Sequence, residues 1–155
     1  MNTAAPLDEP SGLRVVFLDD DPKMRTAFVR MAALHGIRAT AVETKAEVRA
    51  ALADGRADLA VLDFDLGKDR GTSAALAAEL SADELLVVVW TGDPERAREA
   101  LGDAIPVVEK EGDIGGLFGE VARLIRRRAA ALAAVMAGEG AFAGDEGGGD
   151  DHRGR

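Results

Sequence analysis

The sequence predicts an α/β fold in which five parallel strands form one doubly wound sheet with five helices. Strand-like and helix-like patterns alternate along the chain five times, as in repeated strand–helix units. The segments 59–62 and 85–90 are continuous apolar runs, which is typical of parallel strands covered by helices on both faces. A length of 155 residues, 47% of them hydrophobic, suits a single compact domain with a real core.

The expected elements follow one another in a regular order. They are strand 13–18, helix 22–35, strand 37–42, helix 44–54, strand 58–63, helix 71–81, strand 85–90, helix 94–101, strand 105–109 and helix 113–137. The first helix has clear boundary signals, because Asp21 can act as its N-cap and Pro22 suits the first helical position. Gly36, directly after His35, suits the C-terminal cap of the same helix.

The last helix is expected to pack on the sheet as far as residue 128, through Leu117, Val121, Leu124 and Ile125. Alanine-rich residues 129–137 should extend it as a helix. Segment 138–155 contains seven glycines and many acidic residues, and we expect it to be disordered. Segment 1–12 should be disordered too, and its acidic residues and prolines do not fit a secretory signal.

Composition excludes several classes of function. A net charge of −9 argues against a nucleic-acid surface, which needs clustered lysine and arginine. The chain has no cysteine, so disulfides and thiolate metal sites are excluded. Its apolar runs are far too short for a membrane span. These features predict a cytoplasmic protein that binds neither nucleic acid nor membrane.

Acidic residues stand where two of the predicted strands end. The strand at 13–18 is followed by Asp19 and Asp20, and the strand at 58–63 ends on Asp63. Carboxylates that converge at the C-terminal edge of a parallel sheet repel one another unless some are protonated or a cation joins them. Mg²⁺ prefers oxygen ligands and commonly uses one or two carboxylates together with a phosphate oxygen. The sequence therefore predicts a Mg²⁺ site made by these three acids.

Two later strands end on residues that suit phosphoryl chemistry. Asp63, at the end of the third strand, is a candidate nucleophile toward phosphorus, as in acyl-phosphate intermediates. Thr91 ends the fourth strand and can offer a hydroxyl to a phosphoryl oxygen, whereas Lys110 follows the fifth strand and can balance charge on another. We therefore expect a phosphoryl-binding site at this edge of the sheet.

This constellation resembles the receiver domain of two-component response regulators, over residues 13–128. The resemblance implies a flavodoxin-like fold in which Asp63 accepts a phosphoryl group from a histidine kinase or a phosphotransfer protein. It also implies that Asp19 and Asp20 help Asp63 to hold Mg²⁺. The backbone carbonyl of Asp65 would be a further metal ligand.

The same resemblance extends to the later strands, with two departures. Thr91 with Gly92 matches the family's pair of a hydroxyl residue and a small residue. Lys110 matches the lysine that closes the family's fifth strand. Val107 stands where the family usually has an aromatic switch residue. Glu111 stands where a proline usually follows the lysine through a cis peptide. The resemblance therefore implies the phosphoryl chemistry, and a relay that does not use an aromatic residue at position 107.

The resulting hypothesis is a phosphorylation-dependent switch of protein–protein contacts, rather than an enzyme. One alternative is a pseudo-receiver that binds partners without phosphorylation. Another is a phosphatase like the haloacid dehalogenases, with Asp63 as nucleophile and Asp65 as general acid. Against it, the acidic pair comes first in the chain and Gly67 stands where that motif has Thr or Val. The apolar residues Leu132, Val135 and Met136 also raise the possibility of a homodimer through the C-terminal helix.

Overall fold

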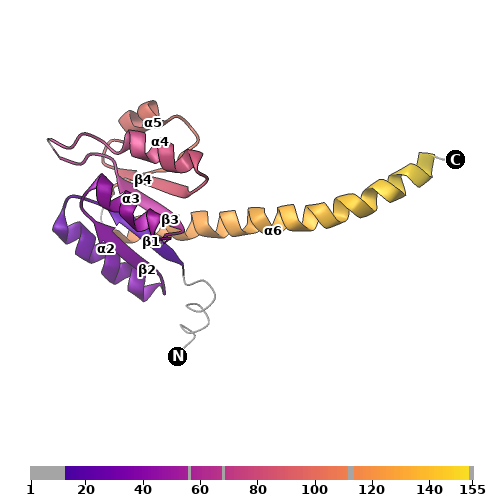
Figure 1. Cartoon of the computed structure of the whole chain (residues 1–155), viewed down its shortest axis with the longest axis horizontal. Coiled ribbons are helices and arrows are strands. Elements are labelled where there is room, and N and C mark those ends of the chain that lie inside the picture. The colour runs from indigo at the N-terminus through magenta and orange to yellow at the C-terminus, as the bar shows by residue number, and fades with distance from the viewer. Residues whose placement is uncertain (1–12, 56, 68, 112–113, 154–155) are drawn as a thin grey trace. The chain divides into compact units, whose positions relative to one another are not determined.

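The computed structural model describes residues 13–55, 57–67, 69–111 and 114–153, and side chains as far as residue 138. Its sheet contains five parallel strands in the order β2-β1-β3-β4-β5 (Figure 1). The strands are β1 (Arg14–Leu18), β2 (Arg38–Val42), β3 (Leu59–Asp63), β4 (Leu86–Thr91) and β5 (Val107–Glu109). The predicted five-stranded, doubly wound sheet is confirmed.

Five helices alternate with these strands in the described part of the chain. They are α2 (Pro22–Leu34), α3 (Lys45–Ala53), α4 (Ala74–Ala82), α5 (Pro94–Leu101) and α6 (Ile114–Arg153). Side chains cap three of them: Asp21 accepts a hydrogen bond from the N–H of Lys23, Thr44 forms a capping box with Glu47, and Asp93 caps α5. Each such cap typically contributes about 1 kcal/mol. Asp21 and Pro22 thus have the predicted roles.

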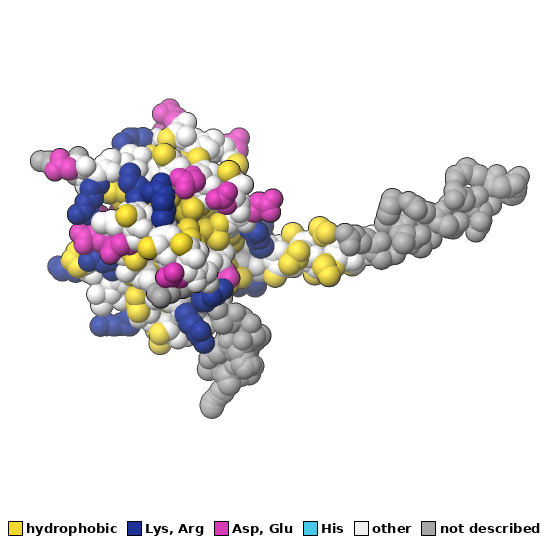
Figure 2. Space-filling view, viewed as in Figure 1, with side chains coloured by type: hydrophobic (Ala, Val, Ile, Leu, Met, Phe, Trp, Pro, Cys, Tyr) yellow, Lys and Arg dark blue, Asp and Glu magenta, His cyan; other side chains and the backbone are white. Residues whose placement is uncertain are grey.

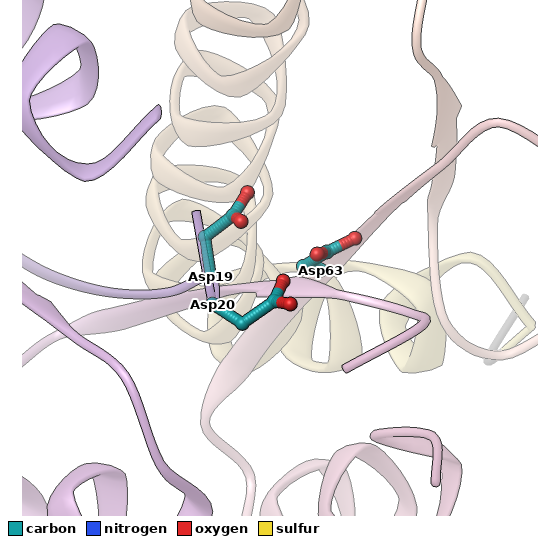
Figure 3. Close-up of side chains that lie close together, drawn as sticks. All are labelled: Asp19, Asp20 and Asp63. Carbon is teal, nitrogen blue, oxygen red and sulfur yellow. The ribbon is translucent and has the colours of Figure 1, made fainter. Parts of the chain in front are cut away.

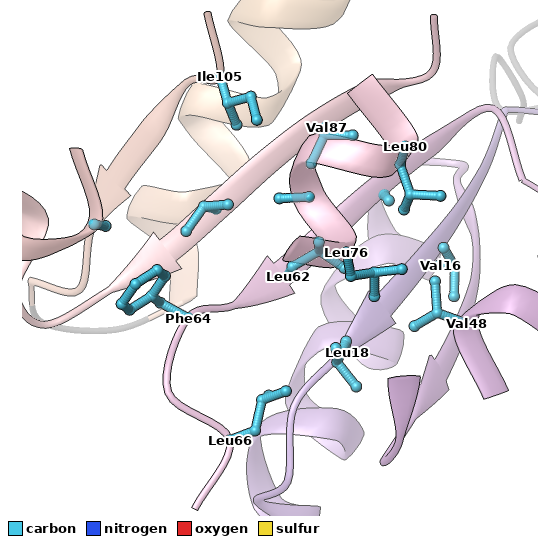
Figure 4. Close-up of a cluster of buried hydrophobic side chains, with 14 of the residues drawn as sticks. Val16, Leu18, Val48, Leu62, Phe64, Leu66, Leu76, Leu80, Val87 and Ile105 are labelled. Atoms are coloured by element: carbon cyan, nitrogen blue, oxygen red, sulfur yellow. The ribbon is translucent and has the colours of Figure 1, made fainter. Parts of the chain in front are cut away.

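Alternation along the strands divides the core into two layers. On one face, Val16, Leu18 and Leu62 are buried against side chains of α3, α4 and α5, including Val48 and Leu76 (Figure 4). Strand β3 is buried at all five positions, as its apolar run predicts.

The other face of the sheet is packed with aromatic rings. Phe17 of β1 stacks on Phe28 of α2 at a centroid distance of 4.1 Å. The ring centroid of Phe28 lies 4.6 Å from that of Phe118, which is in the first turns of α6. Because apolar side chains cover both faces, polar groups gather at the edge where the strands end.

Two elements begin at least two residues later than the sequence predicts. Helix α4 starts at Ala74 rather than 71, because Thr72 forms a bridge with Asp65 and the Ser73 N–H donates to the Phe64 carbonyl. Strand β5 starts at Val107 rather than 105, directly after Pro106, which has no N–H to donate to a sheet ladder.

Helix α6 ends later than predicted, and the chain divides within it, at Gly119, into two units. Its backbone is helical to Arg153, whereas the sequence predicts an end at 137 and a disordered segment 138–155. No proline interrupts this segment, and glycine, unlike proline, disfavours a helix without blocking its hydrogen bonds. The predicted N-terminal segment 1–12 lies outside the described residues. Among the described helices, none has both the length and the apolar character needed to cross a bilayer.

Candidate functional site

Three carboxylates meet at the C-terminal edge of the sheet. Strands β1 and β3 are neighbours, and Leu18 lies opposite Leu62. Asp19, which follows Leu18, therefore lies beside Asp63, which follows Leu62. One carboxylate oxygen from each of Asp19, Asp20 and Asp63 lies within 4.8 Å of the others (Figure 3). Asp19 and Asp63 are buried, and Asp20 is half-buried. The structure therefore brings together the three acids predicted to hold a metal ion.

Lys110 joins this cluster from the end of β5. Its backbone N–H donates to the carbonyl of Thr91 at 2.8 Å, which fixes the residue beside the end of β4. Its ammonium Nζ donates to Oδ1 of Asp63 at 2.9 Å. Asp63 thus has a positive partner on one oxygen and two neighbouring acids.

Burial and crowding make these acids hold protons more tightly than usual. Desolvation is the main cause that raises the pKa of Asp63 to about 7; the charge of Asp19 adds to it, and the hydrogen bond and charge of Lys110 oppose it. Burial likewise raises the pKa of Asp19, against the backbone hydrogen bond from Asp21. Without a bound metal ion, these three acids therefore carry less negative charge near neutral pH than three ordinary carboxylates would.

One buried oxygen in the cluster fits a cation ligand. Oδ1 of Asp19 accepts a hydrogen bond from the N–H of Asp21 at 2.9 Å. Oδ2 of Asp19 is buried and has no hydrogen-bond partner among the described residues. A buried carboxylate oxygen without a donor is costly, and a hard cation would satisfy it. The donor set, all oxygen and anionic, suits Mg²⁺.

The remaining predicted residues lie around the cluster. Thr91 is buried at the end of β4, and its hydroxyl accepts a hydrogen bond from the N–H of Asp93 at 3.0 Å. The Asp65 carboxylate is not part of the acidic cluster and pairs with Arg96 at 2.8 Å. Gly92 is exposed, and no atom within 4 Å would obstruct a side chain there.

Sequence reasoning missed two residues near the site. Gly67 has a φ of +101°, and a Cβ there would lie 3.3 Å from Oδ2 of Asp20. A larger residue would be strained by its backbone and would press on that carboxylate. Arg96 lies over the ring of Phe64, at 5.2 Å from its centroid, besides pairing with Asp65. A glycine four positions after Asp63 was a readable signal, but nothing in the sequence pairs Arg96 with Asp65.

Comparison with solved structures identifies the fold. The receiver domain of a response regulator from Clostridium thermocellum matches with a TM-score of 0.63 at 14% identity, over 76% of this chain and 97% of that one. The response regulator TrrA from Thermotoga maritima, in complex with Mg²⁺-BeF, matches with a TM-score of 0.60 at 19% identity, over 72% and 98%. The receiver domain of TorR, of the TMAO respiratory system, matches with a TM-score of 0.63 at 20% identity, over 74% and 98%.

These matches show the fold of the chain. The chain has the flavodoxin-like fold of response-regulator receiver domains. No family model matches the sequence, and no curated protein matches it either. The role of each residue at the edge of the sheet must therefore be inferred from its own geometry.

Proposed function

We propose that this chain is a response-regulator receiver in which Asp63 accepts a phosphoryl group from a histidine kinase or a phosphotransfer protein. Phosphorylation then switches its contacts with a downstream protein. The observation that supports this most is the Asp63 carboxylate, which is buried, bonded to the Lys110 ammonium and grouped with Asp19 and Asp20. The receiver fold places this group where strands β1, β3 and β5 end.

Each residue of the site has a different role in phosphoryl transfer. An oxygen of Asp63 attacks phosphorus, and the bond between phosphorus and the donor's leaving group breaks as the new bond forms. Asp19, Asp20 and Asp63, with the backbone carbonyl of Asp65, would hold Mg²⁺, which supplies positive charge to the phosphoryl oxygens. Lys110 balances charge on one phosphoryl oxygen.

After transfer, the phosphoryl group gives the site its switching property. Thr91 would turn its hydroxyl from the N–H of Asp93 toward a phosphoryl oxygen. That exchange would release the start of α5, which Asp93 caps. A local charge change of this kind can shift a loop between two populations.

Incubation with acetyl phosphate tests this function. The wild-type protein should gain one phosphoryl group by intact mass when Mg²⁺ is present and none in EDTA, and the group should be lost at alkaline pH. If acetyl phosphate, a histidine kinase and a phosphotransfer protein all fail to label it, the chain is a pseudo-receiver. Continuous hydrolysis of phosphomonoesters would instead indicate the phosphatase related to haloacid dehalogenases.

Asp20→Asn is expected to weaken Mg²⁺ binding by about tenfold or more, because a hard cation loses an anionic partner. Isothermal titration calorimetry measures this directly. The matched control is Asp21→Asn, since Asp21 caps α2 and asparagine caps a helix equally well. Equal Mg²⁺ affinity in the wild type and in Asp20→Asn would remove Asp20 from the site.

We also propose that the second part of α6 associates with a second copy of the chain. Leu132, Val135 and Met136 are 63%, 59% and 66% exposed on this segment. Hydrophobic side chains are visible along helix α6 in Figure 2. Burying one such side chain contributes about 1.5–3 kcal/mol, so a partner helix would gain from covering all three.

Truncation after Arg128 is then expected to convert a dimer into a monomer in light scattering, with phosphorylation preserved. The full-length double variant Leu132→Glu/Val135→Glu keeps the length of the helix but charges its apolar residues, and should also be monomeric. A monomeric mass for the unmodified full-length chain would contradict association through α6.

A further inference from the structure

Trp90 lies directly beneath the ammonium group of Lys110. Nζ of Lys110 is 4.8 Å from the centroid of the indole ring, within the range of a cation–π interaction. The same nitrogen donates to Oδ1 of Asp63 at 2.9 Å. The ammonium is therefore held between an aromatic face and the proposed phosphoacceptor.

A lysine at this place needs such a restraint. Its four-carbon stem is flexible, and its compact ammonium is strongly hydrated. The Lys110 side chain is 35% exposed, so water can compete for its charged end. The backbone bond from Lys110 to Thr91 fixes only the start of the side chain. The indole face supplies a second fixed point close to the charge.

The indole ring is itself held firmly. Trp90 is 4% exposed, and by alternation its side chain lies on the face of the sheet opposite to that of Val89. Phe17 packs against it with a centroid distance of 6.1 Å and an interplanar angle of 48°. Phe17 in turn stacks on Phe28. Burial and the packing of Phe17 restrict the rotation of the indole ring away from Lys110.

We propose that Trp90 is a positioning residue for phosphoryl transfer. Its ring keeps the Lys110 ammonium at the Asp63 carboxylate, where that charge meets the negative charge of the entering phosphoryl group. Trp90 acts through Lys110. The proposal rests on the proposed function, in which Asp63 is the acceptor.

Rates of phosphorylation by acetyl phosphate with Mg²⁺ test this role. Trp90→Leu should slow labelling about tenfold, whereas Trp90→Phe, which keeps an aromatic face, should stay within a few-fold of the wild type. Val88→Ala removes buried volume from the same strand, two residues before Trp90, and controls for lost stability. A rate in Trp90→Leu equal to that of the wild type would overturn the proposal.

A double-mutant cycle separates positioning from a general structural effect. If Trp90 acts through Lys110, Trp90→Leu should cause no further loss in the background of Lys110→Met. Multiplied losses in the double variant would show that Trp90 works independently of Lys110, and would refute the proposal.

Fluorescence tests the contact without any phosphorylation. Trp90 is the chain's single tryptophan, so the emission reports on this ring alone. Lys110→Met should shift the emission of the metal-free protein, and Lys23→Met, a change of an exposed lysine on α2, should not. Identical spectra for all three proteins would refute the contact. If the wild type cannot be phosphorylated at all, the proposed function fails, and a shifted spectrum would show that the contact exists without that role.

Discussion

Asp63→Asn is expected to abolish phosphoryl labelling completely while making the metal-free protein more stable. The amide of asparagine is not a nucleophile toward phosphorus, so transfer stops. Stability should rise because Asp63 is buried beside two other acids and its pKa is about 7 in the folded protein. Intact mass measures the first effect, and denaturant unfolding in EDTA measures the second.

The size of the stability effect depends on pH. A carboxyl whose pKa is higher in the folded than in the unfolded state favours folding at low pH, and this contribution is lost as the pH rises through the folded pKa. The wild type should therefore lose stability relative to Asp63→Asn between about pH 4 and pH 7. At pH 8 the variant should be more stable by on the order of 4 kcal/mol.

Asp58→Asn is the matched control for this prediction. Asp58 precedes the same strand at its opposite end and forms a partly exposed pair with Arg14. The Asp58 carboxylate accepts hydrogen bonds from both the guanidinium and the backbone N–H of Arg14. Asp58→Asn should therefore leave labelling unchanged and lower stability by about 1 kcal/mol, a change opposite in sign to that of Asp63→Asn. Labelling of Asp63→Asn at the wild-type level would place the acceptor elsewhere.

Mg²⁺ is expected to stabilise the folded protein strongly at pH 8 and weakly at pH 5. The ligands must be deprotonated to bind a cation, and burial raises the pKa values of both Asp19 and Asp63. Protons therefore compete with the metal at pH 5. At a concentration of about 100 times its dissociation constant, a ligand of the native state adds about 2.7 kcal/mol.

Thermal unfolding at the two pH values, with and without Mg²⁺, checks this prediction. The shift at pH 8 should be absent from Asp63→Asn if the three acids form one site. An equal shift at pH 5 and pH 8 would mean that the metal binds carboxyls with ordinary pKa values, away from the buried cluster.

The sequence could predict the sheet and the converging acids because both depend on backbone topology. Residues at the C-terminal ends of β1 and β3 must meet at one edge of the sheet when those strands are parallel neighbours. The closeness of Asp19 and Asp63 could therefore be predicted from their positions at the strand ends. The predicted strand 105–109 begins two residues too early, because Pro106 within it has no N–H to donate to the sheet ladder. The end of α6 was missed because glycine content was taken to stop the helix.

Contacts between side chains of distant elements could not be predicted from the sequence. The pair of Arg96 with Asp65, and the indole of Trp90 beneath Lys110, depend on rotamers that only the folded chain fixes. Gly67 is an intermediate case, since a glycine after an acidic strand end suggests an unusual backbone. Its closeness to Asp20 became visible only in the structure.

The most direct test of the central claim is to map the acyl phosphate itself. Protein labelled by acetyl phosphate and Mg²⁺ would be reduced with borohydride, which converts a phosphorylated aspartate into homoserine, and then digested and sequenced by mass spectrometry. The proposed function predicts homoserine at position 63 and unchanged aspartate at positions 19, 20 and 65. Homoserine at another position, or at none in a protein that carries the label, would contradict Asp63 as the phosphoacceptor.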